Sequence, residues 1–354
     1  MRNLVAARKC LVFFLGTLLL AVNIHSTSYG QGRYKIYWTE AGWTKKTGKI
    51  RRAHLDGSHV KDIVTELKAP RAIALDMLRR KVYWTDESTR KIQRADLTGR
   101  NVKDIITGFT FPPGGRSVTI TCRDGKCTGV VYWKEGKIKL THDLLINPRH
   151  IALDVQRKKM YWVNEMLKHI QRANLDGSDV EDLVTYEAFS NALTLDRNRG
   201  KMYWTDYSRN AIRRANFDGS NVENVVATMD EPVSLALDVA RGKIYWTVWI
   251  RGFDGPRTIQ RADLDGSNLE EIFTSPDQLK SLALDPVGGK IYWITSESKT
   301  HTGTIQRANL DGSKVENIIT GLNNPWSIAL DFPGVRVTPS IDKLTTTWGK
   351  MKVE

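Results

Sequence analysis

The chain contains 354 residues, carries a formal net charge of +14 and has only three cysteines. This length allows one domain, two domains, or one closed array of repeats. The sequence has no nucleic-acid-binding motif, no phosphate-binding loop and no Gly-x-Ser-x-Gly element, and its histidines form no metal-ligand motif. These observations argue against a nucleic-acid-binding protein and against an enzyme, and we expect neither a cofactor nor a metal.

Residues 1–30 have the layout of a secretory signal peptide: a basic start, an apolar run over 11–22 and a short polar stretch. The apolar run is too short to span a bilayer, and no later segment is long and apolar enough to do so. Cleavage near Gly30 would leave a mature chain from Gln31. We therefore predict a protein without a transmembrane segment that is secreted to the periplasm or the extracellular space.

The rest of the chain is built on a repeat that contains the pair Tyr-Trp. The pair occurs seven times, beginning at residues 37, 83, 132, 161, 203, 245 and 292. A complete unit reads Ile-Ala-Leu-Asp, a basic turn, Lys-x-Tyr-Trp-Thr-Asp, a polar loop, Ile-Gln-Arg-Ala-Asn-Leu-Asp-Gly-Ser and a short apolar run. The first segment predicts an inner strand buried on both faces, and the aromatic strand suits the space between packed sheets. Four short strands at this period predict the blade of an all-β propeller.

The ends of the repeat predict how the ring closes. The first Tyr-Trp, at 37, has no inner strand before it, and the last inner strand, at 328–331, has no Tyr-Trp after it. Pairing of these terminal strands would complete one blade and remove exposed edges. The repeat count favours a single propeller of seven blades over 31–332, one of them small. The alternative is six blades with an insertion at 109–146. Residues 333–354 are predicted to be a C-terminal tail.

Two cysteines remain in the mature chain, Cys122 and Cys127, on either side of Arg-Asp-Gly-Lys. Asp-Gly favours the centre of a two-residue hairpin turn. Arg123 and Lys126 would then form the hydrogen-bonded pair beside the turn. The cysteines would form the next pair, where Cα atoms approach to about 4.5 Å. That distance is compatible with a disulfide in an exported protein, so we predict a Cys122–Cys127 bridge.

Three motifs carry a family resemblance. Tyr83-Trp84-Thr85-Asp86 and Tyr203-Trp204-Thr205-Asp206 are complete Tyr-Trp-Thr-Asp motifs, and Tyr37-Trp38-Thr39-Glu40 is nearly one. With the Ile-x-Arg-Ala and Leu-Asp-Gly-Ser elements, the chain resembles the low-density lipoprotein receptor class B (YWTD) repeat propellers over residues 34–331. The resemblance implies a propeller fold and a binding role. Family propellers have six blades, and in the receptors they are flanked by cysteine-rich modules that two mature cysteines cannot supply. The resemblance therefore does not imply lipoprotein uptake.

The residues that the repeats share are expected to be scaffold. The arginine of Ile-x-Arg-Ala could form an anion-binding ring, but buried charges must be paired. We expect each to pair with an acid of its own or a neighbouring blade, such as the inner-strand Asp. These arginines are Arg52, Arg94, Arg172, Arg214, Arg261 and Arg307. The acids of the Tyr-Trp-Thr-Asp and Asp-Gly-Ser motifs are expected to cap loops and form turns, because no segment has the ligand density of a calcium loop.

Residues that the repeats do not share are the candidates for ligand binding. One face of a propeller gathers the loops before each inner strand and the loops after each Tyr-Trp, and in the resembled family this face commonly binds peptides and proteins. Aromatic side chains beside arginines are typical of interface anchors. The predicted ligand-binding residues are Trp43, Arg71, Arg149, Asn191, Tyr207, Glu231, Trp249, Arg251, Phe253, Lys280 and Trp326.

We therefore expect a monomeric, non-enzymatic propeller that binds a protein or peptide ligand through this aromatic and basic face. One alternative is a lactonase-like or hydrolase-like propeller with calcium in its channel, although the predicted channel residues suit calcium poorly. Another is electrostatic binding of an anionic polysaccharide by basic turns on the opposite face. These turns lie at 79–81, 157–159, 197–201 and 241–243. They can equally form a solvated surface.

Overall fold

The computed structural model describes residues 34–42, 47–109, 117–123, 126–133, 136–141, 146–186, 190–227, 230–249 and 257–332. These residues form strands joined by turns and loops. In these ranges, no helix has the length and apolar character that a membrane crossing requires. The predicted signal peptide and C-terminal tail lie outside the described residues.

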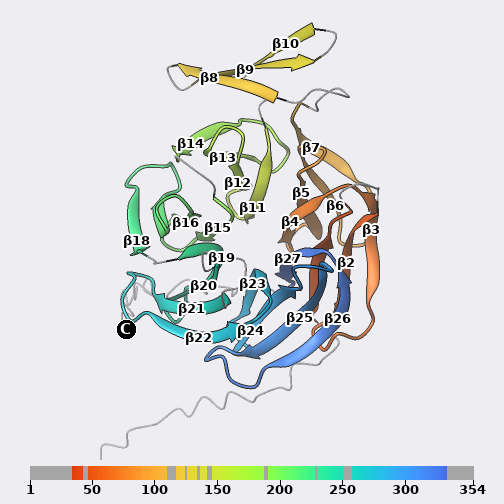
Figure 1. The fold of residues 1–354 in the computed structure, drawn as a ribbon, viewed down its shortest axis with the longest axis vertical. Coiled ribbons are helices and arrows are strands. Elements are labelled where there is room, and N and C mark those ends of the chain that lie inside the picture. The colour runs from red at the N-terminus through yellow and green to blue at the C-terminus, as the bar shows by residue number, and fades with distance from the viewer. Residues whose placement is uncertain are drawn as a thin grey trace, which may run out of the picture. The chain divides into compact units, whose positions relative to one another are not determined.

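Six four-stranded antiparallel sheets form the blades of a β-propeller (Figure 1). We number the blades from the N-terminus and give their strands from the inside outward. Blade 1 contains β27 (Pro325–Leu330), β1 (Lys35–Glu40), β2 (Gly48–His54) and β3 (Lys61–Leu67). Blade 2 contains β4 (Pro70–Asp76), β5 (Lys81–Asp86), β6 (Lys91–Asp96) and β7 (Lys103–Thr107). Blade 3 contains β11 (Pro148–Asp154), β12 (Lys159–Asn164), β13 (His169–Asn174) and β14 (Glu181–Thr185).

The remaining blades follow the same order. Blade 4 contains β15 (Leu193–Asp196), β16 (Lys201–Asp206), β17 (Ala211–Asn216) and β18 (Glu223–Ala227). Blade 5 contains β19 (Glu231–Asp238), β20 (Lys243–Trp249), β21 (Arg257–Asp263) and β22 (Glu270–Ser275). Blade 6 contains β23 (Gln278–Asp285), β24 (Lys290–Ser296), β25 (Thr302–Asn309) and β26 (Glu316–Asn323). The Tyr-Trp pair of each blade lies in its second strand, as predicted.

The ring closes through blade 1, as the ends of the repeat predict. Strand β27 comes from the C-terminal end of the repeat and pairs with the N-terminal strand β1, with Ile328 opposite Trp38 and Ala329 opposite Tyr37. The inner strands contact one another in the order β4, β11, β15, β19, β23 and β27, and β27 returns to β4. No edge of the array is therefore left open around the inner ring.

The favoured count of seven blades is wrong, and the alternative of six blades with an insertion at 109–146 is correct. Strands β8 (Ser117–Arg123), β9 (Lys126–Trp133) and β10 (Gly136–Leu140) form a separate three-stranded sheet, drawn outside the ring in Figure 1. Blades 2 and 3 are direct neighbours, because Gly177 of blade 3 approaches the carbonyl of Ile105 in β7. The same approach joins other neighbouring blades, such as Gly219 of blade 4 and Leu183 of blade 3.

The hairpin in this inserted sheet has the predicted register. Arg123 lies opposite Lys126, and Cys122 lies opposite Cys127. Cys127 belongs to a small buried cluster that contains Leu140 of β10 and Leu167 of blade 3. The inserted sheet is therefore held against blade 3 by apolar contacts.

Each Tyr-Trp pair contributes one ring to each of two blade interfaces. Tyr83 of blade 2 lies in the same buried cluster as Trp162 of blade 3, and Tyr161 of blade 3 shares a cluster with Trp204 of blade 4. The relation recurs at the other four interfaces. These twelve rings are all less than 2% exposed. Successive strand residues point to opposite faces of a sheet, so one dipeptide fills both neighbouring interfaces. This explains why the pair is repeated.

The repeated arginines also join neighbouring blades. Arg214 Nη1 donates to the carbonyl oxygen of Leu264 in the next blade at 3.0 Å, and its Nε donates to Glu223 in the outer strand of its own blade at 2.8 Å. The corresponding arginines of blades 3, 5 and 6 make the same two kinds of contact. In blades 1 and 2 the carbonyl contact remains, but a lysine lies opposite the arginine where the other blades have Glu.

The prediction that these arginines pair with an acid is therefore correct in four blades, whereas the suggested partner, the inner-strand Asp, is wrong. That Asp is bound by an arginine three residues later, in the turn between the first two strands. The pairs are Asp76–Arg79, Asp154–Arg157, Asp196–Arg199 and Asp238–Arg241. The short turn places this local arginine next to the buried carboxylate, where it pairs with the charge. The Ile-x-Arg-Ala arginine, in the third strand, pairs with other groups.

Candidate functional site

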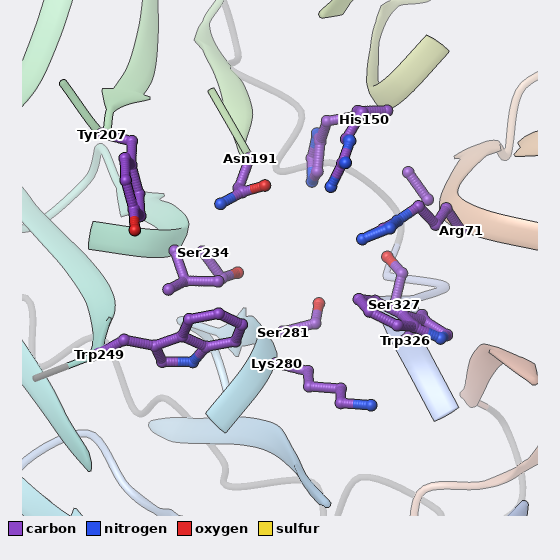
Figure 2. A pocket seen from close by; sticks show the side chains of 13 residues that line it. Arg71, His150, Asn191, Tyr207, Ser234, Trp249, Lys280, Ser281, Trp326 and Ser327 are labelled. Atoms are coloured by element: carbon purple, nitrogen blue, oxygen red, sulfur yellow. The ribbon is translucent and has the colours of Figure 1, made fainter. Parts of the chain in front are cut away.

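A cavity of ≈ 300 Å³ lies where the six inner strands begin. The residues just before the Ile-Ala-Leu-Asp segments supply most of its wall, and two aromatic residues that follow Tyr-Trp in blades 4 and 5 supply the rest. The lining consists of Arg71, Ala72, Arg149, His150, Asn191, Tyr207, Val233, Ser234, Trp249, Lys280, Ser281, Trp326 and Ser327. Figure 2 shows these side chains arranged around the opening.

The threonine of the Tyr-Trp-Thr-Asp motif positions the wall residues. Thr85 Oγ1 accepts a hydrogen bond from the backbone N–H of Ala72 at 3.1 Å and donates to the carbonyl oxygen of Arg149 in the next blade at 3.1 Å. Thr205 and Thr247 likewise accept from the backbone N–H of Ala192 and Ser234. A residue that the sequence identifies as scaffold thus sets the backbone that presents the variable residues.

A second set of hydrogen bonds links each inner strand to the next. Ser234 Oγ accepts from Leu282 N at 3.1 Å, and Ser281 Oγ accepts from Ile328 N at 3.3 Å. His150 occupies the corresponding place in blade 3, where its Nδ1 accepts from the backbone N–H of Leu193 at 3.3 Å. Burial lowers the pKa of His150 to about 4. Its ring is therefore neutral at pH 7, as an acceptor nitrogen requires.

Two arginines and two glutamates form an alternating network on the side of blades 2 and 3. Arg71 pairs with Glu87 at 2.7 Å, and Arg149 pairs with Glu165 through Nε at 2.5 Å and through Nη2 at 2.7 Å. Arg149 also lies 3.6 Å from Glu87. Burial lowers the pKa of Arg71 to about 10, partly offset by the charge of Glu87. The Arg71 guanidinium is therefore charged at pH 7, and both guanidinium groups are held in place by the acids behind them.

Lys280 is a buried cation in the same wall. Its residue is 8% exposed, and its ammonium lies 4.2 Å from the ring centroid of Trp326. The guanidinium of Arg71 lies 3.9 Å from the same centroid. Figure 2 shows Trp326 between Lys280 and Arg71. Burial, followed by the positive charge of Arg71, lowers the pKa of Lys280 to about 8.

The side of blades 4 and 5 is apolar and aromatic. Tyr207, Val233 and Trp249 form this part of the lining, and Trp249 Nε1 donates to the carbonyl oxygen of Leu279 at 3.3 Å. Among the described residues, the cavity wall contains three cations and no carboxylate. It can therefore receive an anionic group on one side and an apolar or aromatic group on the other.

Most of the predicted ligand-binding residues meet in this cavity. Those that line it are Arg71, Arg149, Asn191, Tyr207, Trp249, Lys280 and Trp326. Trp43, Arg251 and Phe253 lie outside the described residues. Glu231 does not line the cavity: it is 7% exposed and lies opposite Trp249 in the strand register.

Glu231 lies four residues before its Leu-Ala-Leu-Asp segment, whereas Arg71 lies two residues before its Ile-Ala-Leu-Asp segment. The residue two before that segment in blade 5 is Val233, which lines the cavity. Sequence reasoning also missed the residues directly before Ile-Ala-Leu-Asp, namely Ala72, His150, Ser234, Ser281 and Ser327. Counting back one residue from that motif in every blade would have found them.

The basic turns on the opposite face carry less free charge than their sequence suggests. Arg79, Arg157, Arg199 and Arg241 are each bound to the buried inner-strand Asp of their own blade. Pairing of this kind neutralises much of the ring of charge, which weakens the case for a polyanion-binding surface there.

Comparisons with known proteins agree with this architecture. The family model "low-density lipoprotein receptor repeat class B" matches residues 80–108, which contain the second, third and fourth strands of blade 2. This match and the six-bladed fold support the chain's similarity to the YWTD-repeat β-propellers. Its resemblance to this family, carried by the Tyr-Trp-Thr-Asp motifs, is thereby confirmed, and so is the six-blade count of the family.

Individual relatives are distant. The human low-density lipoprotein receptor-related protein 5-like protein is 27% identical over 151 residues, which cover 42% of this chain and 44% of that protein. The match therefore spans less than half of the curated relative. A chain in the crystal structure of a nidogen/laminin complex has a TM-score of 0.64 at 20% identity and covers 84% of this chain and 98% of that one.

Two further solved structures share the fold. TolB from Acinetobacter baumannii has a TM-score of 0.62 at 14% identity, covering 85% of this chain and 67% of that one. A Bacteroides uniformis protein assigned as a 6-phosphogluconolactonase has a TM-score of 0.52 at 13% identity, covering 84% of this chain and 98% of that one. At such identities these likenesses concern the fold alone.

Proposed function

We propose that this YWTD propeller is an exported, non-enzymatic binding protein that takes a protein or peptide ligand at the cavity face. The observation that carries the proposal is the meeting of Trp249, Trp326, Tyr207 and two arginines, all from non-repeated positions, around one concave opening. Buried aromatic and arginine side chains are the usual anchors of protein interfaces. The likeness to a chain of the nidogen/laminin complex supports the proposal, since that chain has a similar fold and was solved in a complex of two proteins.

Panning of a random peptide display library against the mature chain would test the proposal. We expect enriched peptides to lose at least about tenfold in affinity when Trp249 and Trp326 are both changed to Ala, because removing a central interface anchor typically costs about 2 kcal/mol or more. The control is Leu78→Ala, which removes an apolar side chain that is 73% exposed on the opposite face. Enriched peptides that bind the double variant and the parent equally would refute the proposal.

A lactonase-like enzyme is the alternative that the Bacteroides uniformis neighbour raises. The lining speaks against it, because a calcium site needs several oxygen ligands, and the wall residues that the structure describes include three cations and no carboxylate. Calorimetric titration with calcium and an assay on a panel of lactones would separate the two functions. Calcium binding together with lactone hydrolysis that is lost in Asn191→Ala would favour the enzyme.

We further propose export by cleavage near Gly30 and a disulfide between Cys122 and Cys127. The opposed positions of the two cysteines in the β8–β9 register and the burial of Cys127, which is 1% exposed, support the bridge. Intact mass measurement of the secreted protein, before and after reduction, tests both. A secreted protein whose mass still includes residues 1–30 would contradict the cleavage. Two free thiols before reduction would contradict the bridge.

A further inference from the structure

Acids compensate the repeated Ile-x-Arg-Ala arginines at most blade interfaces. Each arginine donates to a carbonyl oxygen in a turn of the next blade. In five of the six turns the residue after that carbonyl is an aspartate, namely Asp56, Asp176, Asp218, Asp265 and Asp311. The pKa of Asp218 is lowered first by hydrogen bonds from Ser220 and also by the charge of Arg172, so this turn acid lies within electrostatic reach of the arginine. In blades 3–6 a glutamate also lies opposite the arginine.

The interface between blades 1 and 2 has neither of these acids. Arg52 of blade 1 lies opposite Lys61, and its Nη1 donates to the carbonyl oxygen of Leu97 in blade 2 at 3.2 Å. The residue after Leu97 is Thr98, and Arg100 takes the place of the serine that ends this turn in the other blades. Within the described residues, none of the three cations Arg52, Lys61 and Arg100 forms an ion pair with a carboxylate.

Backbone packing brings these cations together with one more. Gly99 packs directly against β3, since a Cβ there would lie 1.8 Å from the carbonyl oxygen of Ile63. The backbone N–H of Leu97 donates to the carbonyl oxygen of Arg80 at 3.0 Å, which holds the basic turn before β5 against the same place. We call the four cations the basic seam: Arg52, Lys61, Arg80 and Arg100, of which all but Arg52 are exposed.

Acids close to the basic seam are bound to other groups. Asp62 pairs with two cations on the other face of its sheet, because successive strand residues point to opposite faces. Asp96 pairs with Lys81. Asp331 lies within electrostatic reach of Arg52, but it is 8% exposed and accepts a hydrogen bond from a backbone N–H. The basic seam therefore presents positive charge to solvent, in contrast to the paired arginines of the turns around it.

The position and composition of the basic seam indicate what it can bind. It lies on the face opposite the cavity, because the inner strands begin at the cavity whereas β2 ends and β3 begins at the seam. The described part of the chain exposes no Trp, Tyr or Phe side chain there. Protein partners usually need such anchors, whereas a flexible polyanion binds to cations that are spread over a surface.

We propose that the basic seam binds an anionic polysaccharide, whose sulfate or carboxylate groups take the place of the acids that the other blades supply. The guanidinium groups of Arg52, Arg80 and Arg100 bind such groups through charge-assisted N–H donors, and Lys61 adds a fourth charge between the two blades. The surface is separate from the cavity. The inference therefore goes beyond the proposed function and does not depend on it.

Binding of a fluorescently labelled heparin decasaccharide to the mature protein, followed by fluorescence anisotropy, tests the proposal. The seam variant combines Lys61→Glu, Thr98→Asp and Arg100→Ser, which are the residues that blades 3–6 carry at these positions. We expect it to bind at least about tenfold more weakly than the parent at moderate salt. The slope of log affinity against log salt should become shallower by about 2, since each lost contact contributes about 1.

The matched control combines Lys68→Glu and Lys299→Glu, two exposed residues in loops of the cavity face. Each set lowers the net charge by four, because a Lys→Glu change counts two and the other two changes count one each. Equal losses of affinity in the two variants would show an effect of total charge and would overturn the proposal. A parent protein that does not bind the decasaccharide would overturn it as well.

Two further measurements complete the test. Thermal unfolding should show the seam variant to be at least as stable as the parent, because a glutamate opposite Arg52 can make the ion pair found in blades 3–6. If it does not fold, Arg80→Gln with Arg100→Gln changes only exposed side chains and should weaken heparin binding likewise. A poly-glutamate peptide that binds the parent as tightly as heparin, and loses as much affinity in the seam variant, would assign the seam to an acidic protein and overturn the polysaccharide.

Discussion

The hydroxyl of Thr39 donates to the carbonyl oxygen of Arg71 at 2.7 Å, although the two residues belong to different blades. The same Oγ1 accepts from the backbone N–H of Ser327 at 3.1 Å. Thr39 lies in the N-terminal strand of blade 1 and Ser327 in the C-terminal strand that closes the ring. The Thr39 side chain therefore holds the backbone of the closing strand β27 next to that of Arg71. This places the Arg71 guanidinium over the ring of Trp326, the residue before Ser327, in the cavity.

Thr39→Val should destabilise the propeller by about 1–3 kcal/mol, because it leaves a buried N–H and a buried carbonyl without this partner. Valine has nearly the same shape and already occupies the corresponding place in blade 3, at Val163. Denaturant unfolding followed by tryptophan fluorescence would measure the change. The control is Thr194→Val, since the structure records no hydrogen bond of the Thr194 hydroxyl. Equal losses in the two variants would show that the Thr39 contacts do not matter.

Gly177→Ala should cost about 3 kcal/mol or more, because a Cβ there would lie 2.2 Å from the carbonyl oxygen of Ile105 and because φ is +95°. The matched control is Gly200→Ala. Gly200 also has a positive φ, of +64°, but a Cβ would meet nothing within 4 Å. It should cost only about 1–2 kcal/mol. Thermal unfolding of both variants compares them directly. A Gly177 variant as stable as the Gly200 variant would contradict the direct contact between blades 2 and 3.

Replacement of residues 110–145 by a short Gly-Ser linker should leave a folded six-blade ring. The chain leaves and rejoins the ring at adjacent points, because a Cβ on Gly108 would lie 2.7 Å from the carbonyl oxygen of Ile146. The expected loss is about 1–3 kcal/mol, from exposing Leu167, which is now 5% exposed beside the inserted sheet. A chain that no longer unfolds cooperatively in calorimetry would show that the insertion is needed for the ring.

The repeat could be predicted from sequence because its signals are local. Strand order, the Tyr-Trp position and ring closure all follow from periodicity and from the two incomplete ends. The blade count failed because Tyr132-Trp133 looks like its six counterparts while lying in β9 of the inserted sheet. A dipeptide does not reveal whether a neighbouring blade is present to receive its rings.

The cavity was predicted in part for the same reason. The predicted residues two before an Ile-Ala-Leu-Asp type of segment line the cavity, whereas Glu231 lies four residues before its segment and does not. The burial of Lys280 was also invisible, since the residue type by itself indicates exposure. Its environment depends on Trp326 and Arg71, which are contributed by two other blades.

Asp331 should make the stability of the ring depend on pH. It ends the closing segment, is 8% exposed, and accepts a hydrogen bond from the backbone N–H of Lys35 at the start of β1. Burial raises its pKa to about 6, against an ordinary value of 3.8, and the charges of Lys35 and Arg52 offset only part of that effect. Four other blades supply an arginine three residues after the corresponding Asp, whereas Asp331 has no such ion pair among the described residues.

The direction in which the free energy of unfolding changes with pH follows from proton binding by Asp331. Between pH 4 and pH 6 the folded state holds a proton on Asp331 that the unfolded state has lost, so the free energy of unfolding falls as pH rises and levels off above about 6. The loss is at most about 3 kcal/mol. Asp331→Asn retains an acceptor for the Lys35 N–H without the charge. It should be more stable than the parent at pH 7, and the two should converge near pH 4. Urea unfolding at both pH values tests this, with Asp277→Asn as an exposed control. A difference that stays constant between the two pH values would show that the Asp331 carboxylate does not titrate as inferred.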